Sequence, residues 1–262
     1  MSSNHFMGTD GFVWFVGVVE DRNDPSELGR VRVRCVGFHT EDKTRIPTEG
    51  LPWAHVMHPV TDPSMSGMGH TPSFLVEGSW VVGFFRDAEE KQQPIVMGTL
   101  PGIPEDLGNP NTGFNDPNRR DDDSSKPGYN VSIYPREEDV PDVNRLARTI
   151  DQEEQNKTIL RSKRATVVNG VRSASGETWD EPPTTYNAKY PKNHVFESEA
   201  GHIVEYDDTS GSSRVHHYHA SGTMYEIDSI GNKVDKVVGI NYGIKKANSW
   251  EFVEGDMNLT VH

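Results

Sequence analysis

Short β-strand patterns separated by glycine and proline run from Trp14 to Thr99, and they constrain the fold more than any other feature. In the most regular pattern, Val31, Val33 and Cys35 alternate with arginines, which gives one apolar and one polar face. Strand patterns lie at residues 12–20, 29–37, 53–58, 79–85 and 95–100. Five short antiparallel strands at this spacing predict an all-β unit, a partly open five-stranded Greek-key barrel of the OB type.

The composition argues against one large hydrophobic core. Of the 262 residues 33% are hydrophobic, and the mean hydropathy is -0.69. When chains of this composition fold, they bury little apolar surface per residue. We therefore expect modest packed units joined by exposed segments.

The middle of the chain carries little strand signal. Residues 101–136 are dominated by proline, asparagine, aspartate and glycine, which predicts a linker arm. Residues 137–165 are permissive for a short helix that Asp142 could cap, and residues 170–191 form a loop. The expected domains are residues 1–100 (barrel), 101–189 (linker arm with a short helix) and 190–262.

Short strand patterns return after residue 193, now with glycines at their corners. They follow at intervals of roughly ten residues, a spacing typical of a β-solenoid. Their corner glycines are Gly201, Gly211, Gly222, Gly231 and Gly239. A single chain with so few apolar residues cannot close such a core, whereas three chains wound together could.

Two blocks of sequence resemble the baseplate central spike proteins of T-even-like contractile-tailed bacteriophages, which are related to type VI secretion spikes. The first block includes Trp14-Phe-Val-Gly-Val-Val-Glu and Pro94-Ile-Val-Met-Gly-Thr and resembles that family's barrel. The second, Tyr190-Pro-x-x-His-Val-Phe-Glu-Ser-Glu-Ala-Gly-His, resembles the start of its triple-stranded β-helix. One octad after Val253 resembles a turn of the helix repeat.

The resemblance implies a homotrimer in the tail baseplate of a virion, made in the host cytoplasm. The barrel would dock on a trimeric hub protein at the end of the tail tube. The C-terminal part would begin an intertwined trimeric β-helix, the needle that is driven through the bacterial envelope when the sheath contracts. A separate tip protein of PAAR type could complete it.

The chain departs from this family in the segment between barrel and helix. The best-known members carry a lysozyme domain there, whereas residues 101–189 are too short and too linker-like for a hydrolase. Glycoside hydrolysis needs two carboxylates placed beside a cleft, and Asp142, Asp151, Glu153 and Glu154 are more simply a solvated face. We expect no catalytic residues and no enzyme activity.

His217 and His219 are the weak candidates for a metal site. They alternate onto one face of a strand, so a trimer could bring six imidazoles together on its axis around a transition-metal ion. The favoured alternative is that they are ordinary surface or interface histidines, with His219 in a turn. The expectation is therefore no metal ion and no cofactor.

The alternative functional class is a monomeric OB-fold module that binds nucleic acid or oligosaccharide. Arg30, Arg32 and Arg34 share one strand face, and Trp14, Phe15 or Trp53 could stack on bases; these six are the candidates. The formal net charge of -14 would repel a phosphate backbone. Pairing of the arginines with acidic residues, or a contact with the hub, is the simpler explanation.

The remaining sequence signals describe the environment of the chain. Cys35 is the single cysteine, so no intrachain disulfide forms, and its place in an alternating strand predicts buried filler. No run of 18 apolar residues predicts a transmembrane helix, and Met1-Ser-Ser-Asn-His-Phe has no signal-peptide character.

Overall fold

The chain divides after Asp142 into two compact units in the computed structural model. The structure describes residues 12–87, 90–106, 108–117, 138–148, 167–173 and 175–261. The sequence instead predicts boundaries at residues 100 and 189. The difference arises because residues after 100 pack on the barrel, and residues before 190 pack on the C-terminal sheet.

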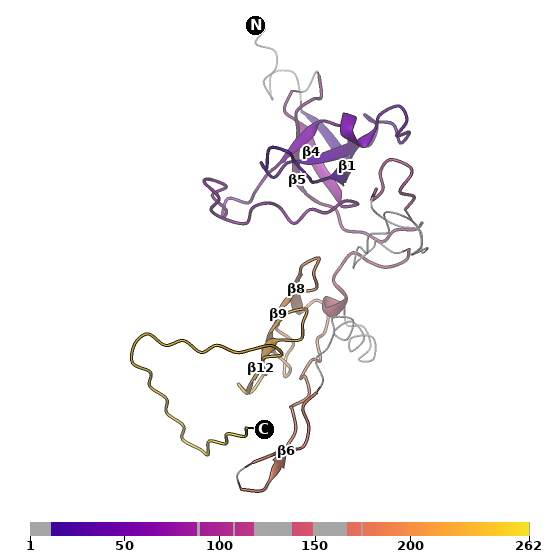
Figure 1. The fold of residues 1–262 in the computed structure, drawn as a ribbon. Coiled ribbons are helices and arrows are strands. Elements are labelled where there is room, and N and C mark those ends of the chain that lie inside the picture. The colour runs from indigo at the N-terminus through magenta and orange to yellow at the C-terminus, as the bar shows by residue number, and fades with distance from the viewer. Residues whose placement is uncertain are drawn as a thin grey trace. The chain divides into compact units, whose positions relative to one another are not determined.

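The first unit contains a closed five-stranded barrel with the order β1-β2-β3-β5-β4 (Figure 1). Its elements are β1 (Val13–Asp21), β2 (Val31–Cys35), the 3-10 helix η1 (Thr48–Gly50), β3 (Trp53–Val56), β4 (Trp80–Phe85) and β5 (Pro94–Thr99). All five predicted strands are confirmed within a few residues. Two details of the prediction were wrong: the barrel is closed rather than partly open, and β3 pairs with β5 in parallel.

Alternation along the strands builds the barrel core. Val31, Val33 and Cys35 point inward from β2, as predicted, and pack with residues from the other strands. Burial raises the pKa of the Cys35 thiol to about 12, so it is a small apolar side chain here. The remaining buried members of the core are Phe15, Val19, Ala54, Leu75, Val81, Phe85 and Val96.

Residues 108–117, predicted as part of a linker arm, cover one side of the barrel instead. The backbone N–H of Gly113 donates to the carbonyl oxygen of Glu41 (2.7 Å), and Lys43 Nζ donates to the carbonyl of Pro110 (2.8 Å). Gly113 lies against Arg34 so closely that a Cβ would meet its Cδ. This strap therefore belongs to the barrel unit. Residues 118–137 lie outside the described residues.

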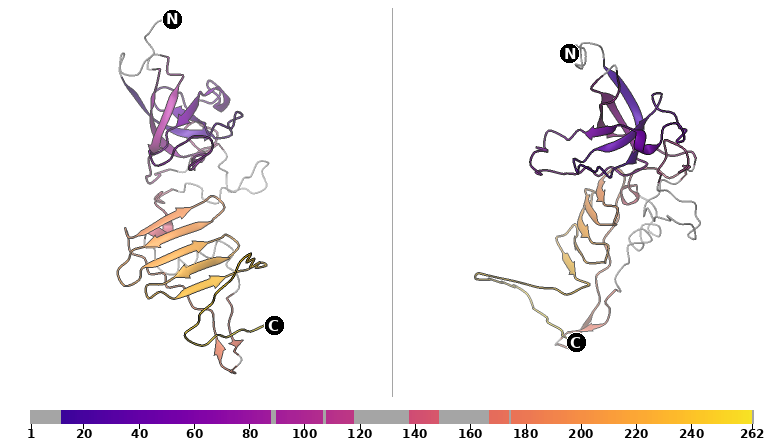
Figure 2. Two further views of the ribbon diagram at one scale, coloured as in Figure 1. Left: turned by 90° about the vertical axis from the view of Figure 1, so that its left-hand side faces the viewer. Right: turned by 45° about the horizontal axis from the view of Figure 1, so that its top comes forward.

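The second unit is built on a five-stranded antiparallel meander of order β12-β11-β10-β9-β8 (Figure 2, left). Its strands are β8 (Asn193–Glu197), β9 (Ile203–Asp207), β10 (Arg214–Tyr218), β11 (Met224–Ile227) and β12 (Lys233–Lys236). A small hairpin pairs β6 (Val171–Arg172) with β7 (Thr178–Trp179). The strands lie where the sequence predicts them, but within one chain they form a meander rather than solenoid turns.

Three of the hairpin turns in the meander share one hydrogen-bond pattern. The first residue of each turn accepts from the glycine N–H three positions later and donates to the carbonyl four positions later. The glycines, with φ of 80°, 94° and 90°, occupy the left-handed region that side chains disfavour. The turns are Ser198–His202, His219–Thr223 and Asp228–Asn232, so the predicted corners at Gly201, Gly222 and Gly231 are confirmed.

The sheet buries one face under segments from earlier in the chain. Leu146, in the 3-10 helix η2 (Arg145–Ala147), packs with Tyr186, Ala188, Ile203 and Tyr218. Apart from η2, the predicted helix at 137–165 falls mainly on residues 149–166, which lie outside the described residues. No helix in the described parts of the chain is long and apolar enough to span a membrane.

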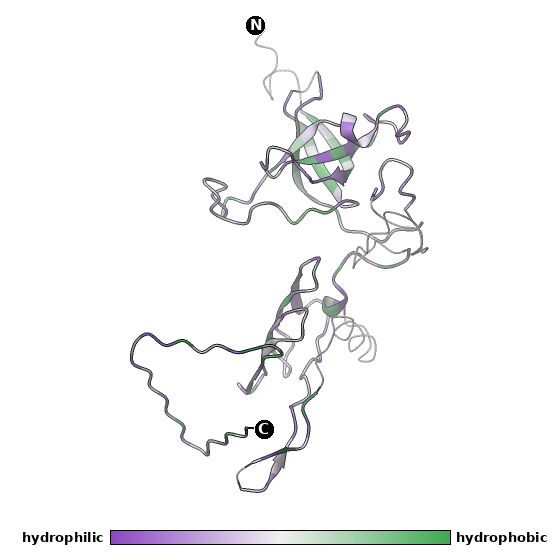
Figure 3. Ribbon diagram, in the orientation of Figure 1, coloured by the Kyte–Doolittle hydropathy of each residue, from purple (hydrophilic) through white to green (hydrophobic). Residues whose placement is uncertain are grey.

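Residues 237–261 form an extended tail without assigned strands. Ile240, Tyr242 and Ile244 alternate with polar or small residues and are 78%, 77% and 81% exposed. The alternation of green and purple is visible along this segment in Figure 3. A period-two apolar pattern is what a β-strand shows when one of its faces is buried.

Candidate functional site

The three arginines of the β2 region are held by acidic or carbonyl groups of the barrel. Arg30 Nε and Nη2 donate to the two carboxylate oxygens of Asp24 at 2.8 and 2.7 Å. Arg32 lies 3.5 Å from a carboxylate oxygen of Asp21, and its guanidinium stacks 4.4 Å over the ring of Trp53. Acid pairing, the simpler of the predicted alternatives, is confirmed.

Arg34 differs from the other two because it is completely buried. Its Nε and Nη2 donate to Glu20 at 2.6 and 3.0 Å, and its other contacts are the carbonyls of Thr40 and Ile46. Glu20 also accepts from the backbone N–H of Phe114 at 3.1 Å, which joins the strap to the pair. Burial acts to raise the pKa of Glu20, but the bonds from Arg34 and Thr48 outweigh it and the pKa is lowered.

A shallow groove of about 330 Å³ lies beside the arginines on the barrel surface. Its lining includes Arg30, Trp53, His55, Arg86 and Ile95. Both arginines already donate within the chain, Arg30 to Asp24 and Arg86 to Gln93. The groove thus lacks the open aromatic platform that base or sugar stacking requires, since Arg32 covers Trp53.

The outer surface of β1, β4 and β5 carries a stripe of apolar side chains. Trp14 pairs across the strands with Phe84, and Phe12 packs against both rings at 4.5 and 4.8 Å. Trp14 is 52% exposed, whereas Phe85, one position after Phe84, is buried in the core. The aromatic residues of β4 therefore contribute both to the core and to the outer surface of the barrel.

The three histidines among residues 216–219 lie in three different environments. His217 points to the half-exposed face and stacks on Tyr225 at 4.6 Å. His219 lies in the turn, as predicted, beside His202 at 4.4 Å between ring centroids. His216 is buried on the opposite face, 2.7 Å from Glu205. Among the described residues of one chain, no group of three or more histidine, cysteine, aspartate or glutamate side chains is arranged for a metal ion.

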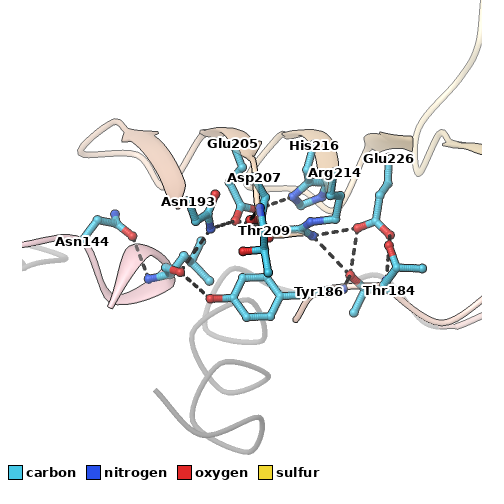
Figure 4. A network of polar contacts seen from close by, with 12 residues as sticks. Asn144, Thr184, Tyr186, Asn193, Glu205, Asp207, Thr209, Arg214, His216 and Glu226 are labelled. Atoms are coloured by element: carbon cyan, nitrogen blue, oxygen red, sulfur yellow. Dashed lines mark hydrogen bonds and ion pairs between the residues drawn. The ribbon is translucent and has the colours of Figure 1, made fainter. Parts of the chain in front are cut away.

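His216 belongs to a buried polar layer that was not predicted from the sequence (Figure 4). Arg214 is its centre: Nη2 donates to Glu205 at 2.7 Å and Nη1 donates to Glu226 at 2.8 Å. Glu205 has no exposed side-chain surface, and its second oxygen faces His216. Two carboxylates therefore share one guanidinium and one imidazole on the buried face of the sheet.

The polar layer attaches earlier segments of the chain to the sheet. Thr184 Oγ1 and the backbone N–H of Thr185 donate to Glu226 at 2.8 and 3.0 Å. Asn193 Nδ2 donates to Glu205 (2.9 Å) and to the carbonyl of Leu146 (3.1 Å), which the hydroxyl of Tyr186 also contacts. At this part of the buried sheet face, hydrogen bonds and ion pairs therefore hold the earlier segments in place where apolar packing would otherwise do so.

The titration of the layer follows from these contacts. Burial works to raise the pKa of Glu205, yet the hydrogen bond from His216 and the charge of Arg214 hold it below its usual value. The pKa of Glu226 is also lowered, because bonds from Thr185 and Arg214 outweigh burial. Burial and the charge of Glu205 raise the pKa of Tyr186.

Strand periodicity contained a signal for this layer. Glu205 and Asp207 share a strand face with Ile203, and Arg214 and His216 share one with Tyr218. Charged residues in phase with buried apolar residues indicate buried partners.

The acidic residues of the middle segment were predicted to be a solvated face. Asp142 accepts a hydrogen bond from the backbone N–H of Gly102 (2.9 Å), while Asp151, Glu153 and Glu154 lie outside the described residues.

Comparison with known proteins places this architecture. Protein Gp5 of Vibrio phage KVP40 is 42% identical over 286 aligned residues, which cover 98% of this chain and 65% of that protein. The pre-baseplate central spike protein Gp5 of Enterobacteria phage T4 is 50% identical over 109 residues, 40% of this chain and 19% of that protein. The chain therefore spans just under two thirds of the first relative's length.

A protein-family model for the Gp5 N-terminal OB domain matches residues 37–192, more than half of the chain. The match includes β3, β4 and β5 of the closed barrel. The chain belongs to the Gp5 N-terminal OB domain family.

Proposed function

We propose that this chain is a central spike component of a phage tail baseplate. In this proposal the barrel docks on a trimeric hub, and three copies associate through their C-terminal parts. The observation that carries it is the combination of an OB barrel with a tail, residues 237–261, that exposes apolar side chains and pairs with no strand among the described residues. The name of the T4 relative, a pre-baseplate central spike protein, supports the same assignment.

Docking of the barrel is supported by the apolar stripe on its outer surface. Phe12, Trp14, Val16 and Met97 are all more than a third exposed, and the register places Trp14 and Val16 on neighbouring positions of one face. Exposed aromatic clusters of this kind mark protein interfaces more often than free surface. A hub protein would bury them.

Trimer formation is supported by the tail. An extended segment with a period-two apolar pattern gains both hydrogen bonds and burial when it pairs with strands of other copies. Intertwined strands would also resist buckling under axial load, which suits a needle that crosses the bacterial envelope. A tip protein of PAAR type stays a prediction of this interpretation, and so does the expectation that His217 and His219 hold no metal ion.

The role proposed here is mechanical rather than enzymatic. The described residues of the segment between barrel and sheet form a strap, a 3-10 turn and a hairpin rather than a domain of their own. The competing OB-fold function, binding of nucleic acid, is disfavoured because the arginines are already paired and the chain is acidic.

Light scattering after gel filtration tests the oligomeric state. We expect a native mass three times the chain mass of 29.3 kDa, and a monomer at micromolar concentration would contradict the trimer. Ile240→Asp places a charge on the apolar side of the tail and should reduce the trimer fraction. Asn241→Asp, the matched control, adds the same charge on the other side and should leave the mass unchanged.

Hub docking is tested separately, by binding the chain to the hub protein of the same phage. Trp14→Arg should weaken binding by about tenfold or more, because the apolar stripe loses its largest exposed side chain and gains a positive charge. Leu28→Arg is the control, since Leu28 is 64% exposed in the β1–β2 loop away from the stripe. Equal binding by both variants would mean that another surface docks.

A further inference from the structure

Several buried polar atoms of the C-terminal sheet have no hydrogen-bond partner among the described residues, and three of them lie in one cross-strand row. These three are Asn193 Oδ1, Asp207 Oδ2 and Arg214 Nε. The register pairs Asp207 with Asn193 on β8 and with Arg214 on β10. Directly opposite residues on one sheet face have Cβ atoms about 4.5–5.5 Å apart, so the three side chains are neighbours.

The neighbouring bonds fix how these side chains are oriented. Asn193 Nδ2 donates to Leu146 and Glu205, both acceptors, so its Oδ1 cannot be exchanged with the nitrogen. Asp207 Oδ1 accepts from the backbone N–H of Thr209 at 2.9 Å, which leaves Oδ2 as the unpaired oxygen. Arg214 uses Nη1 and Nη2 for Glu226 and Glu205, which leaves Nε.

Arg214 and Asn193 also converge on one atom. Arg214 Nη2 and Asn193 Nδ2 donate to the same oxygen, Glu205 Oε1, at 2.7 and 2.9 Å. The row is therefore compact, and all three residues are at most 3% exposed. Figure 4 shows these side chains gathered between the sheet and the segment around Tyr186.

We propose that one internal water molecule binds in this row and completes the polar layer. Its two hydrogens donate to Asn193 Oδ1 and Asp207 Oδ2, and its oxygen accepts from Arg214 Nε. This arrangement satisfies two acceptors and one donor with the three hydrogen bonds that a buried water commonly makes. A metal cation fits less well, because the Arg214 guanidinium would repel it.

The water gives the layer a role in strand register. Neighbouring strands of the meander have similar lengths and turns, so a slip of two residues preserves which side chains face inward. Such a slip would remove Asp207 from between Asn193 and Arg214 and leave several buried polar atoms unpaired, at a substantial free-energy cost. The proposal is independent of the function assigned above.

A crystal structure of the full chain decides the proposal. We expect an ordered water about 2.7–3.2 Å from each of the three atoms. A direct contact between Asp207 and Arg214, a cation at the position, or a side chain of a second copy placed there would overturn it. Each of these is distinguishable in density at high resolution.

Two substitutions of Asp207 provide the matched test in solution. Asp207→Asn keeps a polar group that can bond Thr209 and the water, so the Tm should change little. Asp207→Ala removes the water's ligand and should lower the Tm by about 5 °C. Asp235, on β12 with an exposed side chain, is the control position at which both substitutions should be neutral. Equal losses for Asp207→Asn and Asp207→Ala would contradict the water-bridged role.

Discussion

Glu20 and Arg34 form a two-point ion pair in the barrel, with both side chains completely buried and Nε–Oε1 and Nη2–Oε2 distances of 2.6 and 3.0 Å. The pair joins three parts of the unit, because Glu20 also bonds Thr48 and the strap at Phe114. Removing one partner of such a pair leaves the other charge buried without compensation.

Arg34→Ala should therefore destabilise the barrel by about 3–5 kcal/mol. The measurement is chemical unfolding followed by tryptophan fluorescence. Arg86→Ala is the control, since Arg86 is exposed and its change should stay within about 0.5 kcal/mol. Similar effects for both variants would show that the buried pair contributes nothing specific.

Gly83 is required where β4 pairs with β5. A Cβ at this position would overlap the carbonyl oxygen of Ile95 and lie 2.5 Å from Cζ of Phe15. Gly83→Ala should cost about 1–3 kcal/mol through overpacking, measured by calorimetry. Gly98→Ala, on the neighbouring strand with no atom within 4 Å of its Cβ, should be tolerated. If Gly83→Ala were tolerated as well as Gly98→Ala, the backbone of β5 and the ring of Phe15 would have to shift at little energetic cost.

Acidification should destabilise both units. The pKa values of Glu20, Glu205 and Glu226 are lowered in the folded chain, from an ordinary value of 4.5. The unfolded chain then binds more protons below about pH 4.5, so this stability is complete above that pH and is lost as the pH falls through the folded-state pKa values. Thermal unfolding between pH 7 and pH 3 checks this, and a Tm independent of pH would contradict it.

Leu146 anchors the second core although it lies on a single 3-10 turn. Its side chain is completely buried among Tyr186, Ile203 and Tyr218. Leu146→Ala should cost about 2–5 kcal/mol in the C-terminal unit. Val143→Ala, at a 40% exposed position nearby, should have little effect. Hydrogen exchange of β9 and β10 amides separates this loss from changes in the barrel.

The strands and their corners could be predicted from the sequence because they depend on local pattern. Alternation of Val31, Val33 and Cys35 places one face inward whatever lies across the barrel. Turn glycines such as Gly201 and Gly222 satisfy a backbone requirement that only nearby residues set. These features gave the barrel class and the positions of the C-terminal strands.

What the sequence left open depends on partners far along the chain. From the local sequence, Arg34 and Arg214 would both be expected on the surface. In the fold, β1 brings Glu20 beside Arg34, and Glu205 and Glu226 both contact Arg214, so the two arginines are buried. The closure of the barrel through parallel β3 and β5 likewise requires strands whose paired residues, such as His55 and Ile95, lie about 40 positions apart in the chain. Burial of a charge is decided by whether a distant partner offsets its desolvation, so only the tertiary structure determined these sites.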